Sequence, residues 1–253
     1  FYVKVHRMNK HLIILSRWQN SVNVFPNSFV FIVEVFFMLI ISFLGACVGS
    51  FISALFHRYK HQQKLTGRSH CDHCNHSLTW FDLIPIISFI LLFGKCRYCR
   101  YPISYFSTLI EINLFILFPL IYSLTHSISL LMVVSILLYL SIQDMESLTV
   151  SINPLIVLLC LTVIHSNFLS ISIALPLYLL LTILNERISM FGQADIDVLC
   201  LLYLLFSTAI LYIIIIACIY ALIYFLINRF QVHYIPFVPY IYLAVLTFLC
   251  IQK

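Results

Sequence analysis

Residues 198–227 read VLCLLYLLFSTAILYIIIIACIYALIYFLI and carry no charged side chain. A helix crosses the hydrocarbon core of a bilayer in about 20 apolar residues. This stretch is longer than one crossing needs, so we expect one helix or two helices broken near Ser207. In lipid, backbone N–H and C=O groups must form their hydrogen bonds within the protein, which favours helices. The stretch therefore predicts membrane-spanning helices.

The rest of the composition agrees with a membrane protein. The chain has 253 residues, of which 62% are hydrophobic and 9% are charged, whereas a soluble domain carries about 25% charged residues. This excludes a soluble globular enzyme, a disordered chain and a nucleic-acid binder. We predict an all-α polytopic membrane protein with seven or eight transmembrane helices, whose other apolar segments lie near 30–56, 103–124, 128–143, 152–165, 168–185 and 236–251.

A polar and basic loop separates the first two of these segments. Seven of the 14 Lys and Arg residues lie between Arg58 and Arg100, and short basic loops favour the cytoplasmic side. Within it, Leu83–Phe93 is apolar but too short to span, so we expect an interfacial or re-entrant segment. Basic residues between Lys4 and Arg17 favour the opposite orientation.

The chain divides into three parts. We interpret residues 1–37 as an N-terminal extension of doubtful function, which would remove the conflict over orientation. Residues 38–127 hold the first helix, the polar loop and the second helix, and residues 128–253 form the remaining membrane domain. Such a chain is expected to cross a membrane several times.

Four of the nine cysteines lie in the polar loop, whereas the other five lie in apolar runs, where cysteine acts as a small hydrophobe. The loop four form two C-x2-C pairs, the spacing of a tetrahedral zinc site. Nearby basic residues favour their thiolate forms. A structural zinc ion would stabilise a loop too polar to bury a core. Paired C-x-x-C motifs also carry thiol–disulfide exchange, which is the rival interpretation. The four are Cys71, Cys74, Cys96 and Cys99.

Two aspartates lie where apolar segments meet loops. Asp144 follows the segment 128–143, and Asp195 precedes the long apolar run. Two crossings separate them, so both should return to one membrane face. Two close carboxyl groups share a proton, so one can act as base and the other as acid on a peptide bond. The alternative is that Asp144 is a solvated helix end and Asp195 an N-cap.

Together these features resemble the type IV prepilin peptidase family of membrane aspartyl proteases. The resemblance covers about residues 40–251, and its motifs follow the family order. The matching stretches are Gly45-Ala-Cys-Val-Gly49-Ser50-Phe51-Ile52-Ser53 with Arg58, Arg68-Ser-His-Cys71-Asp-His-Cys74, Asp82-Leu-Ile-Pro85, Gly94-Lys-Cys96-Arg-Tyr-Cys99, Tyr105 to Glu111, Asp144, Gly192-Gln-Ala-Asp195 and Pro236-Phe-Val-Pro239.

The resemblance implies cleavage of prepilin or pseudopilin leaders after Gly, at the cytoplasmic membrane face. It implies Asp144 and Asp195 as catalytic residues, and the Ile/Leu-rich composition is similar to members that serve competence. Many members then N-methylate the new N-terminus with S-adenosylmethionine. Gly49, Ser50 and Glu111 are candidates for a methyl-transfer or substrate region. No Gly-rich loop after a strand indicates that cofactor independently.

The sequence also departs from the family pattern. Ala194 replaces the second Gly of the G-x-G-D motif, Asp197 stands where a Lys is usual, and Ser53 replaces an Asn. Asp197 thus competes with Asp195 as the second acid, and Ser53 leaves methylation open. Two other functions remain as alternatives: a membrane thiol oxidoreductase using both C-x2-C pairs, and a non-catalytic scaffold whose zinc loop binds a partner.

Overall fold

The computed structural model describes residues 27–64, 67–188, 192–228 and 235–251. Its described part is helical and contains no strand, which confirms the all-α class. The helices begin with α2 (Asn27–Lys60) and continue with α4 (Tyr105–Thr125), α5 (Ile128–Ser147), α6 (Ile152–His165), α7 (Phe168–Ile188), α8 (Gln193–Phe206), α9 (Ile210–Ile227) and α10 (Val238–Ile251). Residues 1–26, most of the predicted extension, lie outside this description.

Five helical stretches in the described part are long and apolar enough to cross a membrane. Two more apolar helices, α6 and α10, are shorter. The expected break in the longest stretch is confirmed, because α8 ends at Phe206 and a single turn, η2 (Ser207–Ala209), leads into α9. Ser207 has a φ of 48°, which interrupts the helical backbone. The predicted total of seven or eight crossings stays a prediction.

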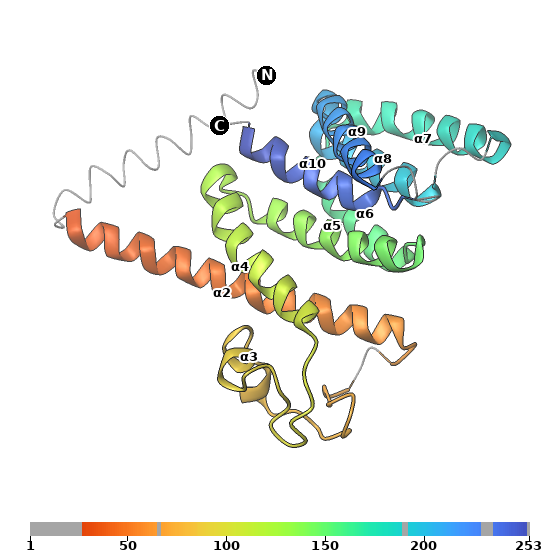
Figure 1. Cartoon of the computed structure of the whole chain (residues 1–253). Coiled ribbons are helices and arrows are strands. Elements are labelled where there is room, and N and C mark those ends of the chain that lie inside the picture. Colours follow the sequence, from red (N-terminus) through yellow and green to blue (C-terminus); the bar gives the residue numbers. More distant parts are fainter. Residues whose placement is uncertain (1–26, 65–66, 189–191, 229–234, 252–253) are drawn as a thin grey trace.

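The helices form two groups (Figure 1). Helix α2 packs along α4. The polar loop lies below this pair in Figure 1 and contains two short helical segments, η1 (Trp80–Leu83) and α3 (Ile87–Leu91). The second group contains α6 to α10. Helix α5 joins the groups, because it contacts α2 and α4 on one side and α6 and α10 on the other.

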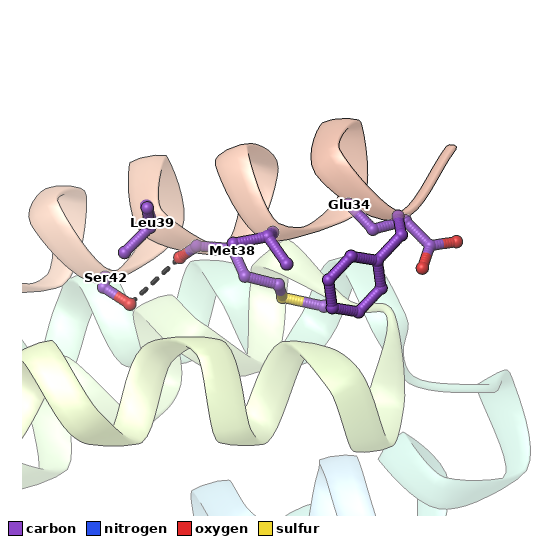
Figure 2. A pocket seen from close by; sticks show the side chains of 6 residues that line it. Glu34, Met38, Leu39 and Ser42 are labelled. Atoms are coloured by element: carbon purple, nitrogen blue, oxygen red, sulfur yellow. Dashed lines mark hydrogen bonds between the residues drawn. The ribbon is translucent and has the colours of Figure 1, made fainter. Parts of the chain in front are cut away.

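A continuous apolar core runs through this junction. Its fully buried side chains include Leu114 of α4, Leu137 and Leu140 of α5, and Ile241 and Val245 of α10. Between membrane-spanning helices, such side chains stabilise the packing through van der Waals contacts. The core thereby fixes the end of α5 against the beginning of α10. Other helices cover the N-terminal half of α2 less than its C-terminal half. A shallow hollow in its surface is lined by Glu34, which is exposed, and by Met38 and Ser42 (Figure 2).

Candidate functional site

The four loop cysteines come together as the sequence predicts. Their sulfur atoms all lie within 4.8 Å of one another, and Cys71 Sγ lies 3.8 Å from Cys99 Sγ. In a tetrahedron with Zn–S bonds of about 2.3 Å, neighbouring sulfurs lie about 3.8 Å apart. The donor set and its spacing therefore fit a structural zinc ion.

The cysteines belong to two copies of one backbone motif, which we call the first knuckle (residues 69–78) and the second knuckle (residues 94–103). In the first, the N–H of Asn75 donates to the Cys71 carbonyl at 2.9 Å. In the second, the N–H of Arg100 donates to the Cys96 carbonyl at 3.0 Å. Asn75 and Arg100 both have a φ of 58°, so each knuckle turns through the left-handed region at the same place.

The remaining hydrogen bonds of the two knuckles also correspond. Within each knuckle, the first cysteine N–H donates to a carbonyl five residues ahead, and a hydrogen bond between the first and last residues of the knuckle, nine positions apart, closes the base of the loop. Every position in the second knuckle follows its counterpart by 25 residues, as 96 − 71 shows. The loop is thus built from two equivalent halves, which explains how it presents four thiols to one point.

Aromatic rings pair the two knuckles reciprocally. His73 stacks on Tyr101 with ring centroids 4.2 Å apart, and His76 packs on Tyr98 at 3.7 Å. Under the 25-residue correspondence, His73 is equivalent to Tyr98 and His76 to Tyr101. Each knuckle therefore gives two rings to the other in a pseudo-twofold arrangement. These two histidines pack between the knuckles, and neither belongs to the cysteine cluster.

Asp82 ties the segment between the knuckles to the second knuckle. Its Oδ1 accepts a hydrogen bond of 2.7 Å from Arg97 Nε, and its Oδ2 accepts from the backbone and side chain of Thr79. Burial by itself would raise the pKa of Asp82, but the Thr79 hydrogen bonds and the Arg97 charge outweigh it and hold the pKa below its ordinary value.

Asp144 lies three residues before the end of α5, and its residue is only 5% exposed. Its Oδ2 accepts a hydrogen bond of 3.1 Å from the backbone N–H of Val238, the first residue of α10. The opening N–H groups of a helix have no partner within the helix and favour a negative charge. The solvated-end alternative for Asp144 is therefore wrong: the carboxyl is buried against a helix start.

Asp195 lies in the first turn of α8 and its carboxyl folds back to the backbone N–H of Gly192. A Cβ on Gly192 would lie 2.9 Å from Asp195 Oδ2, so glycine gives the carboxyl its place. Gly192, not Asp195, is the N-cap residue. Asp195 also interacts electrostatically with Asp144, and α6 and α10 both contact α5 and α8. The two predicted acids are therefore close enough for their charges to interact.

Asp197 is held on another side of α8. Its carboxylate accepts a hydrogen bond of 3.0 Å from Gln193 Nε2 and another from Tyr178 of α7. Residues two apart on a helix do not share a face. Because Asp197 is directed to α7, the geometry favours Asp195 as the partner of Asp144.

Gly45 and Gly49 let α2 approach α4 closely, as the G-x-x-x-G spacing predicts. A Cβ on Gly45 would lie 2.3 Å from the Leu114 carbonyl oxygen, and one on Gly49 would lie 2.8 Å from Glu111 Cα. Near this contact, the hydroxyls of Ser53 and Ser107 lie 2.8 Å apart. Gly49 is therefore a packing residue in this structure.

Glu111 is buried in α4, 7% exposed, and points to the polar loop. Its Oε2 accepts a hydrogen bond of 2.8 Å from the backbone N–H of Ile86, which precedes α3 and has a φ of 62°. A cavity of about 720 Å³ lies here, between α2, α4 and the loop. Ser50 and Glu111 both line it, so two of the three residues predicted for a substrate or methyl-transfer region face one space.

Sequence reasoning missed the residues that fix the end of α5. Gln143 is fully buried; its Oε1 accepts from the Ser151 backbone and hydroxyl, and its Nε2 donates to Tyr139. Glu146 forms an ion pair with Lys60 at the end of α2. The available signal was Gln143 itself, a polar residue at the end of an apolar run and next to Asp144. A buried glutamine usually has hydrogen-bond partners.

Part of the chain is similar to known proteins. Residues 43–125 match the family described as Bacterial Peptidase A24 N-terminal domain. This part of the chain is therefore similar to the N-terminal domain of that peptidase family. This match covers 83 of 253 residues and contains both knuckles and Glu111. No solved structure matches the chain.

Three relatives are named prepilin leader peptidase/N-methyltransferase. The protein from Myxococcus xanthus is 37% identical over 83 residues, which are 32% of this chain and 25% of the relative. The Vibrio cholerae protein is 30% identical over 97 residues, 34% of this chain and 38% of the relative. The Bacillus subtilis protein is 40% identical over 70 residues, 27% of this chain and 28% of the relative. The chain thus aligns with about a quarter to two fifths of each.

Proposed function

We propose that the protein is a membrane aspartyl endopeptidase that removes the leader of type IV prepilin-like precursors. The observation that carries this proposal is the approach of Asp144 and Asp195 at the ends of α5 and α8, beside the start of α10. The names of the relatives support the substrate class. Asp144 and Asp195 are the proposed catalytic residues.

The surroundings of the two acids suggest different roles for them. The N–H of Val238 stabilises a negative charge on Asp144, so Asp144 takes the proton from the attacking water. Asp195 then gives its proton to the carbonyl oxygen as the water oxygen bonds to the carbonyl carbon. When the C–N bond breaks, the leaving nitrogen takes the proton from Asp144. Atoms and charge balance, and Asp195 recovers its proton from the collapsing intermediate.

The basic loop and the apolar helices suggest how a precursor binds. The Lys and Arg residues of the loop favour the cytoplasmic side, which supports a cut at the cytoplasmic membrane edge. The apolar segment of the precursor would lie among the helices of the enzyme, with its leader outside the bilayer and the cut after the Gly between them. Pseudopilins of competence systems are the precursors that the composition favours.

We further propose that Cys71, Cys74, Cys96 and Cys99 hold a structural zinc ion. The two knuckles have the same backbone hydrogen bonds and pack their rings against each other, which supports a role for the ion in shaping the loop. When bound, the ion would fix the two halves of the loop to each other, and the proposed hydrolysis needs only the two aspartates. A thiol oxidoreductase would instead cycle these cysteines between redox states, and a scaffold would need neither acid.

Co-expression with a candidate prepilin tests the proposal. The new N-terminus of the product should begin directly after the Gly of the precursor, and its mass should reveal any added methyl group. The same precursor expressed with the Asp195→Asn variant should keep its leader. Leader removal that is unchanged by this substitution would contradict the aspartyl mechanism.

A further inference from the structure

We infer that residues 80–93, between the two knuckles, form a membrane anchor whose outward face contacts the acyl chains of the bilayer. The anchor enters the lipid and returns to the same face of the membrane, and Glu111 holds its backbone at that depth. The sequence predicts only that Leu83–Phe93 is interfacial or re-entrant. This contact with lipid is independent of the proposed peptidase chemistry.

The two faces of α3 are arranged for lipid rather than for water. Residues 83–93 read LIPIISFILLF, in which Ser88 is the one polar side chain. Ser88 lines the cavity between the loop, α2 and α4. Ile87, Ile90 and Leu91 share another face through their helical spacing, and they are 47%, 63% and 71% exposed. A helix at a water surface has the reverse pattern, with its polar residues outward, so this face fits acyl chains.

The contact of the segment with α4 gives its depth. Helix α4 has 21 residues, which extend about 32 Å at 1.5 Å per residue. The hydrocarbon core is about 30 Å thick, so α4 needs its whole length to cross it. Glu111 lies six residues after Tyr105, the first residue of α4, or about 9 Å along the helix. Its Oε2 accepts the Ile86 N–H at 2.8 Å, which fixes Ile86 beside a membrane span and inside its entrance.

The backbone of the segment has hydrogen-bond partners suited to this depth. Lipid offers no such partners, so non-helical backbone in a membrane needs acceptors within the protein. The N–H groups of Ser88, Leu92 and Phe93 donate to carbonyls of the same segment. Ile86 is the N-cap residue of α3 and has a φ of 62°, and its N–H donates to Glu111. Glu111 therefore supplies the acceptor that lets the chain turn inside the membrane.

The ends of the segment lie on one side of the membrane. One end leaves the first knuckle and the other enters the second, and the two knuckles pack against each other. At the first end, Trp80 is exposed and stacks on Phe81, and tryptophan is enriched where a membrane meets water. Beyond the other end, Lys95 and Arg100 are exposed and fit anionic lipid headgroups.

The apolar segment of a precursor is the competing partner for this face. A helix that docks on a protein lies in a groove, whereas the cavity lies on the opposite side of α3, which Ser88 and Leu92 line. Lipid surrounds a membrane-embedded surface whether or not a precursor is present. The depth of the segment and its outward apolar face therefore favour lipid.

Tryptophan fluorescence of the full chain in vesicles tests the anchor, because the sequence has only two tryptophans, Trp18 and Trp80. The vesicles contain equal parts of phosphatidylcholine and phosphatidylglycerol, with bromine on their acyl chains as a quencher. In Trp18→Phe, the remaining Trp80 should lose fluorescence to these lipids. With both tryptophans replaced by Phe, Leu91→Trp should lose more fluorescence than its neighbour Leu92→Trp, which lines the cavity. Lys64→Trp, on the exposed link after α2, should be quenched by aqueous acrylamide instead.

Substitution of Glu111 tests its part in the anchor. In the Leu91→Trp protein, Glu111→Leu should reduce quenching by the brominated lipids, because the Ile86 N–H loses its acceptor. Glu111→Gln should preserve the quenching, since an amide oxygen also accepts a hydrogen bond. Equal quenching in these two variants would overturn the role of Glu111. Melting temperature shows whether each variant is folded.

Three results would overturn the anchor itself. They are quenching of Leu91→Trp by acrylamide but not by brominated lipid, equal quenching of Leu91→Trp and Leu92→Trp by the lipid, and protection of Leu91→Trp from acrylamide only after a prepilin is added. The last result would assign this face to the precursor. Because no cleavage is measured, failure of the peptidase proposal would leave the anchor standing, and the reverse also holds.

Discussion

Asp144 accepts a hydrogen bond from the backbone N–H of Val238, 94 residues further along the chain. The bond joins the last turn of α5 to the first turn of α10. It places a carboxylate at the positive end of a helix, in a part of the protein where an uncompensated charge would be costly. This relationship supports the proposal that Asp144 is the charged member of the pair.

Substitution of the acids should separate Asp195 from its neighbour Asp197. Asp144→Asn and Asp195→Asn should each lower the rate of leader cleavage by about 10²–10⁴-fold, because each removes a proton-transfer group. Asp197→Asn should change the rate by less than about threefold, since Gln193 and Tyr178 hold Asp197 away from the pair. The measurement is single-turnover cleavage of a purified prepilin.

Loss of cleavage in Asp197→Asn together with near-normal cleavage in Asp195→Asn would reverse this assignment. Membrane insertion and melting temperature serve as controls, since all three substitutions are close in size. An unchanged rate in every variant would favour a non-catalytic scaffold.

Zinc content should depend on the knuckle cysteines only. Purified protein should contain about one zinc ion per chain, and Cys71→Ser or its counterpart Cys96→Ser should reduce that content and loosen the loop to proteolysis. Cys218→Ser, an exposed cysteine of α9, should leave both unchanged. Elemental analysis and limited proteolysis make the measurement. Protein that contains no metal and whose cysteines change redox state during turnover would support the oxidoreductase alternative.

How far the sequence predicts this fold depends on the range of the interactions. The helices from α4 to α10 follow from apolar runs that are local and long. The zinc site follows from spacing within each C-x2-C pair. The contact of Asp144 with Val238 depends on tertiary packing across four intervening helices and leaves no local pattern.

The equivalence of the two knuckles could not be predicted from the sequence for another reason. The two knuckles share only their cysteines in sequence, because backbone hydrogen bonds and positive φ values, not matching side chains, make them alike. Similarly, Ile86 orients Glu111 through its N–H, which any residue other than proline can offer. Such backbone contacts are not encoded in residue type.

The carboxyl of Asp82 should titrate below its ordinary range. Because the folded pKa lies below the unfolded value of about 3.9, its contribution to stability is complete above that value and is lost as the pH falls through the folded pKa. Arg97→Gln should raise the pKa of Asp82, whereas Arg100→Gln on the same knuckle should have little effect. The contribution is modest, because Arg97 is half exposed and screened by salt.

Carboxyl ¹³C NMR of selectively labelled protein follows the titration of Asp82 directly. The pKa can therefore be measured without unfolding the protein in acid. Equal pKa values of Asp82 in the unaltered protein and in Arg97→Gln would contradict the ion pair as a cause.

The close approach of α2 and α4 gives a stability prediction. A Cβ on residue 45 would lie 2.3 Å from the Leu114 carbonyl oxygen, a backbone atom that cannot move without its helix. Gly45→Ala should therefore force the helices apart and lower the free energy of unfolding by about 1–3 kcal/mol, the usual cost of overpacking. Melting in detergent measures the change. Leu44→Ala, at an exposed neighbouring position, should have a smaller effect; the reverse order would show that α2 and α4 are not packed through this face.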